Sequence, residues 1–191
     1  IGLGILLFIV IVAILAPFLN LHDPLKMNIS LRFAPLGTDN HLLGTDNLGR
    51  DLLSRFIWGA RPSIIIGLVP VVVGIIVSTI LGSIAGYMRG WPESIIMRGL
   101  DVILALPPVF LAITIAAIFG AGLKNMLFAL TFILIPPMTR VVYQEILRIK
   151  NLLFIDSAKT TGAGTTRIIV RHILPNSIST LLAYGASVAA L

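Results

Sequence analysis

The chain has 191 residues, of which 57% are hydrophobic and 12% are charged, and its formal net charge is +6. Soluble domains carry about 25% charged residues, so this composition indicates a membrane protein and excludes an ordinary soluble domain. It has no cysteine, its histidines (His22, His41 and His172) are scattered, and no basic run resembles a nucleic-acid-binding arm, so we expect no disulfide, no metal site and no nucleic-acid partner.

Five apolar segments predict membrane-spanning helices in an all-α polytopic membrane protein. They cover residues 1–19, 63–87, 102–119, 126–142 and a stretch that begins at 178. None alternates as a strand of an outer-membrane barrel does, which favours helices. Residues 178–191 are too few to cross about 30 Å of hydrocarbon at about 1.5 Å per residue. The first segment starts without a basic flank, and we therefore expect the chain to be incomplete at both ends.

Several glycines and prolines lie within these apolar segments. Because small residues let helix backbones approach closely in lipid, the glycines of the second segment predict a neighbouring helix against it, although glycine is also generally common in membrane helices. These are Gly67, Gly74, Gly82 and Gly86. We also expect the second, third and fourth segments to be interrupted at Pro70, Pro107-Pro108 and Pro136-Pro137, either along a transport path or as simple kinks.

Basic residues in the connecting loops predict the orientation. The loops 86–101 and 143–171 are basic, whereas the turn 120–125 has only Lys124. By the positive-inside rule both loops are cytoplasmic and the turn is external, so residues 20–62 form an external loop. That loop carries five basic residues, and a long loop translocates with limited regard to its charge.

The external loop contains a short motif, residues 44–60, that predicts a helix. Its start is a turn and helix-cap signal, and Leu48, Leu52 and Phe56 recur at helical spacing, which predicts a short amphipathic helix on the outer membrane surface. Asp46, Arg50 and Asp51 could pair and hold the turn, or the motif could contact a partner protein. The motif residues singled out are Gly44, Thr45, Asp46, Gly49, Arg50 and Asp51.

Segment 152–165 is polar and rich in small residues although it lies between apolar segments. Asp156 suits the start of a short helix, and Gly162 suits its end. Ser157 and Ala158 are small enough for a partner surface to approach closely. A basic helix then runs to Pro175, where we expect a bend. Local physics leaves two interpretations open: a cytoplasmic docking helix, or an ordinary loop that re-enters the bilayer.

Charged residues near the expected spans define no substrate site. They are Arg98, Asp101, Arg140 and Glu145. Arg98 and Asp101 are three residues apart and can pair on a helix. All four lie near expected cytoplasmic ends, where long side chains can reach the interface, so the substrate-contacting residues stay undetermined.

Segment 152–165 and its continuation resemble the "EAA" loop of binding-protein-dependent ABC importer permeases. Asp156, Ser157 and Ala158 take the places of Glu-Ala-Ala, and Gly162 takes the place of its glycine. Leu174-Pro175 is the closing pair. The exchanges of Asp for Glu and Ser for Ala keep the charge and the small size.

A second set of motifs resembles the dipeptide, oligopeptide and nickel branch of that family. It comprises HLLGTD (41–46), LGRD (48–51), SR (54–55), GAR (59–61), GY (86–87), GW (90–91), MR (97–98) and DV (101–102). The resemblance implies a type I permease fold with five of six spans present. It divides the chain into a first transmembrane helix (1–19), an external loop (20–62) and a permease core (63–191) with a coupling helix at about 152–165.

The resemblance also implies a function and its partners. The chain would line the path of an importer of di- or oligopeptides, or of nickel or glutathione, in a bacterial or archaeal cytoplasmic membrane. Its partners would be a related permease, two ATPases that use ATP and Mg²⁺, and an extracytoplasmic substrate-binding protein. Asp156, Ser157, Ala158 and Gly162 would transmit force, with Arg167 and Arg171 as flanking contacts.

Two further expectations concern the class of protein. The chain has no Walker glycine loop, so it binds no cofactor itself and does not hydrolyse ATP. An ion-coupled secondary transporter or a channel is the alternative from another class, and it predicts acids at mid-span, of which the sequence shows no convincing example.

Overall fold

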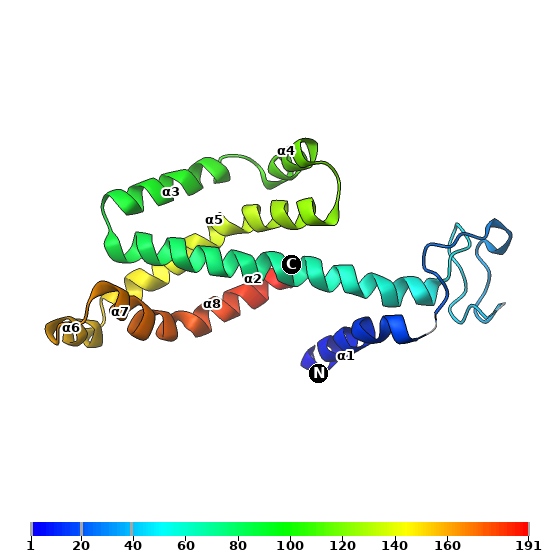
Figure 1. The fold of residues 1–191 in the computed structure, drawn as a ribbon, viewed down its shortest axis with the longest axis horizontal. Helices are drawn as coiled ribbons and strands as arrows, with labels where there is room; N and C mark the ends of the chain where they lie inside the picture. The colour runs from blue at the N-terminus through cyan, green and yellow to red at the C-terminus, as the bar shows by residue number, and fades with distance from the viewer. Residues whose placement is uncertain (1, 20, 39, 191) are drawn as a thin grey trace. The chain divides into compact units, whose positions relative to one another are not determined.

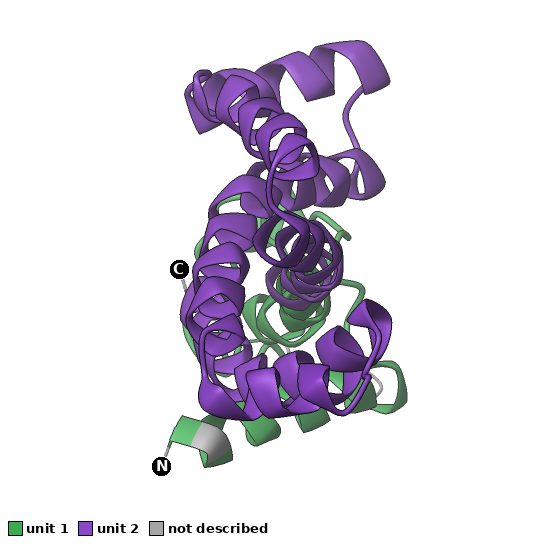
Figure 2. Cartoon of the chain, turned by 90° about the vertical axis from the view of Figure 1, so that its left-hand side faces the viewer, with its two compact units in different colours: residues 1–66 green, residues 67–191 purple. Residues whose placement is uncertain are grey.

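The computed structural model describes residues 2–19, 21–38 and 40–190, and most of them are helical (Figure 1). Within those ranges the structure has no β-strand and two isolated bridges, Thr38 with His41 and Thr45 with Asp51. The all-α class is confirmed. The chain divides into two compact units, Ile1–Ile66 and Gly67–Leu191 (Figure 2), and each is described by itself.

The first unit contains an apolar helix, a loop with two short 3₁₀ turns, and the start of a long helix. In chain order these are α1 (Gly2–Leu15), η1 (Ala16–Phe18), η2 (Ile29–Leu31) and the first turns of α2 (Leu52–Met88).

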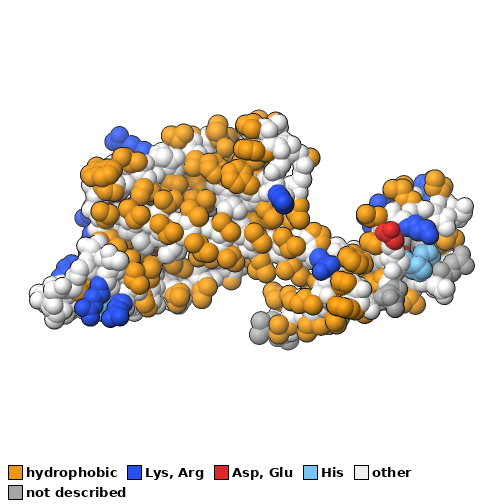
Figure 3. Space-filling view, in the orientation of Figure 1, with side chains coloured by type: hydrophobic (Ala, Val, Ile, Leu, Met, Phe, Trp, Pro, Cys, Tyr) orange, Lys and Arg blue, Asp and Glu red, His pale blue; other side chains and the backbone are white. Residues whose placement is uncertain are grey.

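The second unit contains the remainder of α2 and the other helices. They are α3 (Trp91–Leu104), α4 (Pro108–Phe119), α5 (Leu123–Lys150), α6 (Leu153–Thr160), α7 (Thr165–Ile168), η3 (Ile169–Ile173) and α8 (Leu174–Ala189). Helix α5 is central, because α3, α4 and α8 all contact it. Hydrophobic side chains cover much of the surface of this unit in Figure 3, as expected of helices that face lipid.

Glycines of α2 allow it to lie directly against α5. An added Cβ would lie 2.9 Å from Met138 at Gly74, 2.7 Å from Val142 at Gly82, and 2.9 Å from Ile146 at Gly86. At Gly82 and Gly86 the close atoms include a Cβ, so only a residue without a Cβ permits this approach, whereas at Gly74 the close atom is the sulfur of the flexible Met138 side chain. The predicted neighbour of the glycine-bearing helix is therefore α5. Gly67 has open space around it instead.

Among the described residues, two helices are long and apolar enough to cross a membrane, α2 and α5, and a third crossing is possible if α3 and α4 together form one broken span. The second and fourth expected spans lie within these two helices. Helix α1 is apolar but has 14 residues, and α8 has 16.

The third expected span, 102–119, is not a single helix. It is divided between α3 and α4, whose axes differ by 87°. Pro107-Pro108 explains the break, because proline lacks an N–H and disfavours the helical conformation of the residue before it. At the other two expected interruptions the helices continue: α2 runs through Pro70, and α5 runs through Pro136 and Pro137.

The external motif does not form a separate amphipathic helix. Leu48 lies in the loop, whereas Leu52 and Phe56 belong to the first turns of α2. Once a helix has been nucleated, each further residue adds a hydrogen bond at little cost. Gly59 and Pro62 are residues typical of a helix end, yet the helix continues through both, so the predicted helix and the predicted second span fuse into one.

Candidate functional site

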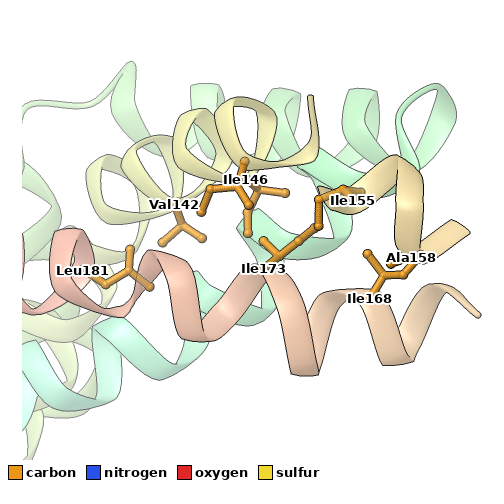
Figure 4. Packing of buried hydrophobic residues seen from close by; sticks show 8 residues of the cluster. Val142, Ile146, Ile155, Ala158, Ile168, Ile173 and Leu181 are labelled. Atoms are coloured by element: carbon orange, nitrogen blue, oxygen red, sulfur yellow. The ribbon is translucent and has the colours of Figure 1, made fainter. Parts of the chain in front are cut away.

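Helix α6 is anchored by one apolar face. Ile155 is fully buried and Ala158 is 9% exposed, and both belong to a cluster with the end of α5 and the helices that follow (Figure 4). The other buried members of the cluster are Val142, Ile146, Ile149, Ile168, Ile173 and Leu181. Burying several aliphatic side chains stabilises such a contact by about 1.5–3 kcal/mol for each one fully buried. Helix α6 is thereby held against α5, α7 and η3.

Gly162 ends α6 as predicted. Its φ is +81°, a left-handed conformation that glycine adopts without strain. Its N–H donates to the carbonyl oxygen of Lys159 at 2.9 Å, and the N–H of Ala163 donates to that of Ala158 at 3.1 Å. These two bonds form a Schellman motif, which satisfies the last carbonyls of the helix.

The opposite face of α6 is exposed and charged. Asp156 lies in the first turn, three residues after the helix begins at Leu153; the helix thus starts earlier than the sequence suggested. The Nζ of Lys159 donates to Asp156 at 2.8 Å, and this hydrogen bond raises the pKa of Lys159. The Oγ of Ser157 donates to the Leu153 carbonyl at 3.2 Å. Because the ion pair between Asp156 and Lys159 is exposed, it contributes little to the stability of the fold.

A groove of about 480 Å³ separates α6 from the helices that follow it. Its lining residues are Phe154, Ser157, Ala158, Thr161, Ala163, Arg167 and His172. The groove thus brings together three of the predicted residues, Ser157, Ala158 and Arg167. Asp156 and Arg171 lie outside it. Figure 3 shows Lys and Arg side chains gathered at this end of the unit.

Sequence reasoning missed Phe154, Thr161, Ala163 and His172 as groove residues. A signal was present for two of them: Phe154, Ser157, Ala158 and Thr161 follow the i, i+3, i+4, i+7 spacing of one helix face. His172 carries no such signal, because its position depends on the helical path after α7.

The expected basic helix from Thr165 to Ile173 is not one regular α-helix. Helix α7 has four residues, a π-helical turn covers Ile169–Ile173, and α8 begins at Leu174. Pro175 lies in the first turn of α8, a position where a missing N–H is well tolerated. Turns of the π type are rare and often occur at functional sites, and this one lies between α7 and α8.

The external motif forms a hydrogen-bonded loop. Asp46 pairs with Arg50 at 2.8 Å, as predicted, and also with Arg55. Burial opposes ionisation of Asp46, but the N–H groups of Arg50 and Leu48 and the Arg50 side chain outweigh it, so the pKa of Asp46 lies well below its ordinary value. The buried Thr45 hydroxyl donates to the Leu31 carbonyl and accepts from the Ala34 N–H at 2.9 Å.

Asp51 does not pair with Asp46 or Arg50 as the sequence suggested. It is 4% exposed and accepts hydrogen bonds from the Nδ1 of His41 at 2.8 Å, the N–H of Ser54 at 2.7 Å and the Oγ of Ser54 at 2.6 Å. Burial raises the pKa of Asp51. The hydrogen bonds lower that pKa by more than burial raises it, so the net shift is downward. Asp51 thereby acts as the N-cap of α2.

The two motif glycines are required by close backbone contacts. Both have a φ of +71°, and an added Cβ would lie 2.4 Å from the Ala34 oxygen at Gly44 and 1.7 Å from the Asn28 oxygen at Gly49. All six motif residues thus hold the loop, which favours the structural interpretation of the motif over the contact with a partner.

Near the spans, Asp101 pairs with Arg140 of α5 rather than with Arg98. The predicted pair within α3 is therefore wrong. Tertiary packing of α3 on α5 brings the two side chains together. Glu145 is 8% exposed and accepts from Arg148 at 2.7 Å and from the Thr180 hydroxyl of α8 at 3.1 Å. It connects α5 to α8.

Residues 78–191 match the family described as "Binding-protein-dependent transport system inner membrane component". This match covers more than half of the chain, and the chain belongs to that family. The members of this family form one class of protein: they are the helical, membrane-embedded permease components of ABC importers.

Several relatives within the class resemble the chain. It is 43% identical to the glutathione transport system permease protein of Pectobacterium atrosepticum over 144 residues, 75% of this chain and 48% of the relative. It is 38% identical to the di/tripeptide transport system permease protein of Pseudomonas aeruginosa over 186 residues, 95% and 61% of the two chains. It is 36% identical to the dipeptide transport system permease protein of Bacillus subtilis over 181 residues, 95% and 56%. The chain therefore spans about half to three fifths of the length of these curated relatives.

Proposed function

We propose that the chain is a permease subunit of an ATP-driven importer of di- and oligopeptides in the cytoplasmic membrane of a bacterium or archaeon. The proposal is supported by the family match, by relatives named for peptide and dipeptide transport, and by a helical fold with apolar spans. Together with a second, related permease, the chain would line the translocation path. An extracytoplasmic protein would deliver the substrate.

The proposal rests mainly on how α6 is packed, with one face buried and the other exposed. Its buried face, Ile155 and Ala158, is fixed to the ends of α5 and α7, whereas Ser157 faces an open groove. A push on α6 is therefore transmitted to α5 and α8 through packed side chains rather than absorbed by a loose loop. An element of this kind can couple an ATPase to the spans.

ATP and Mg²⁺ would bind to two separate cytoplasmic ATPase subunits. The described chain offers no group of three or more His, Asp or Glu side chains arranged to hold a metal ion, and its sequence has no Walker glycine loop. To the ATPase cycle the chain would contribute mechanical coupling. The secondary-transporter alternative lacks support from the relatives.

Glutathione is a second candidate substrate, because the relative named for glutathione transport is 43% identical over 75% of the chain. Glutathione is itself a small peptide, so the same path could accept it. Uptake of labelled dipeptide, glutathione and Ni²⁺ by cells that carry the complete system separates these substrates. Saturable dipeptide uptake that requires this chain supports the proposal, and uptake of Ni²⁺ alone overturns it.

Single-cysteine crosslinking tests the coupling. The 191 residues contain no cysteine, so Ser157→Cys introduces one thiol on the groove face of α6. Lys124→Cys, in the first turn of α5, is the matched control. In the assembled importer, Ser157→Cys should be captured by a nucleotide-binding subunit and Lys124→Cys should not. Capture of Ser157→Cys by an extracytoplasmic reagent instead would contradict the proposal.

A further inference from the structure

Arg61 occupies a boundary position in α2. It is the last charged residue before residues 62–88, which contain none. At about 1.5 Å per residue that stretch extends about 40 Å, enough to cross about 30 Å of hydrocarbon. Arg61 therefore lies where α2 passes from a polar surrounding into lipid.

The side chain of Arg61 differs from those of its basic neighbours. Arg50 and Arg55 both pair with Asp46. The Cζ of Arg61 instead lies 5.4 Å from the centroid of the Trp58 ring. A cation–π contact of this kind orients the guanidinium and leaves its edge N–H groups available to an anion. Tryptophan is also enriched at the membrane interface.

An apolar groove of about 300 Å³ adjoins Arg61 within the first unit. It is lined by Val10, Ala13 and Ile14 of α1 and by Arg61, Ile64 and Ile65 of α2. Among the described residues that line it, Arg61 alone is charged. The groove thus combines one cation at the lipid boundary with a hydrocarbon-like wall.

We propose that this groove binds an anionic phospholipid, with the phosphate on the guanidinium of Arg61 and an acyl chain along α1 and α2. A guanidinium matches a phosphate with two parallel hydrogen bonds. The apolar wall excludes water and suits an acyl chain. Neighbouring side chains of α1 are also apolar and exposed, with Ile11 at 53% and Ile14 at 62%, as expected where lipid surrounds the helix.

The test measures phosphatidylglycerol bound to the assembled, detergent-solubilised importer by native mass spectrometry. Arg61→Gln is expected to lower the apparent affinity at least fivefold, and Trp58→Leu about twofold or more. Lys124→Gln is the matched control, an equal loss of charge at a residue that does not line the groove, and should bind as the unchanged protein does. Equal binding by Arg61→Gln and the unchanged protein overturns the proposal.

A second measurement does not depend on the folding of the Arg61 variant. In the unchanged complex, brominated phosphatidylglycerol should quench the fluorescence of Trp58 more strongly than brominated phosphatidylcholine does. The fluorescence of Trp58 is obtained as the difference between the unchanged protein and the Trp58→Phe variant. Equal quenching by both lipids overturns the proposal, as does efficient crosslinking of Ile14→Cys to a second permease chain, because a protein helix would then occupy the groove.

Discussion

Gly82 of α2 lies so close to α5 that an added Cβ would be 2.7 Å from the Cβ and Cγ1 of Val142 and 3.1 Å from the carbonyl oxygen of Thr139. The distance to Val142 is shorter than real Cβ atoms tolerate. The carbonyl oxygen of Thr139 belongs to the backbone and cannot move aside as the end of a flexible side chain could. The contact between α2 and α5 therefore depends on a missing methyl group.

Gly82→Ala should lower the stability of the helical bundle by about 1–3 kcal/mol, because overpacking shifts one of the two helices. The measurement is thermal unfolding in detergent. Gly67→Ala is the matched control: it lies in the same helix with open space around it and should be neutral or stabilise by up to about 1 kcal/mol through helix propensity. Equal melting temperatures for both variants would show that the close approach is absent.

Gly162→Ala should weaken coupling between ATP hydrolysis and transport, since its φ of +81° costs an L-residue about 1–2 kcal/mol. The Schellman motif and the position of α6 would then be strained. The measurement is the ratio of substrate transported to ATP hydrolysed in reconstituted vesicles, which we expect to fall several-fold.

Gly164→Ser is the control for that experiment. Gly164 is the N-cap of α7 with a φ of −69°, a conformation open to any residue, and serine is favoured at N-caps. The transport ratio should not change. A fall of similar size in both variants would indicate that any substitution in this loop acts alike.

Arg167→Gln should reduce coupling more than Arg171→Gln does. Arg167 lines the groove beside α6, whereas Arg171 lies outside it. Both variants lose one positive charge from the same basic surface. A difference in activity between them therefore measures the effect of the position in the groove. Transport-stimulated ATPase activity is the readout, and equal losses would assign the effect to net charge alone.

Asp51→Ala should destabilise the start of α2 by about 1 kcal/mol or more, because it removes the N-cap and leaves His41 and Ser54 without their acceptor. Asp51→Asn, which retains a capping oxygen, should cost less. Protease cleavage of the loop before α2 reports this opening. Faster cleavage in Asp51→Asn than in Asp51→Ala would contradict the capping role.

The same interaction predicts a pH dependence. The pKa of Asp51 is lower in the folded protein than its ordinary value. Its ionised form therefore stabilises the fold fully above about pH 4, and this contribution is lost as the pH falls through the folded pKa. The acid sensitivity of loop cleavage should be smaller in Asp51→Asn than in the unchanged protein.

Local patterns in the sequence determined the helical class and the end of α6 at Gly162. Each of these depends on neighbours within a few residues: apolar runs, a glycine after a helix, and small residues on one face. The i, i+3, i+4, i+7 spacing from Phe154 to Thr161 would also have indicated the groove face. Such features need no knowledge of what lies opposite.

Tertiary structure decided the remainder. Asp101 pairs with Arg140 across two helices, His41 pairs with Asp51 across a loop, and His172 reaches the groove from within the π-helical turn. Local preference also misled at Pro136-Pro137, where α5 continues, and at residues 52–60, which extend α2. The physical reason is that these outcomes depend on which surfaces pack together, and a proline is tolerated or a helix prolonged when that packing outweighs the local cost.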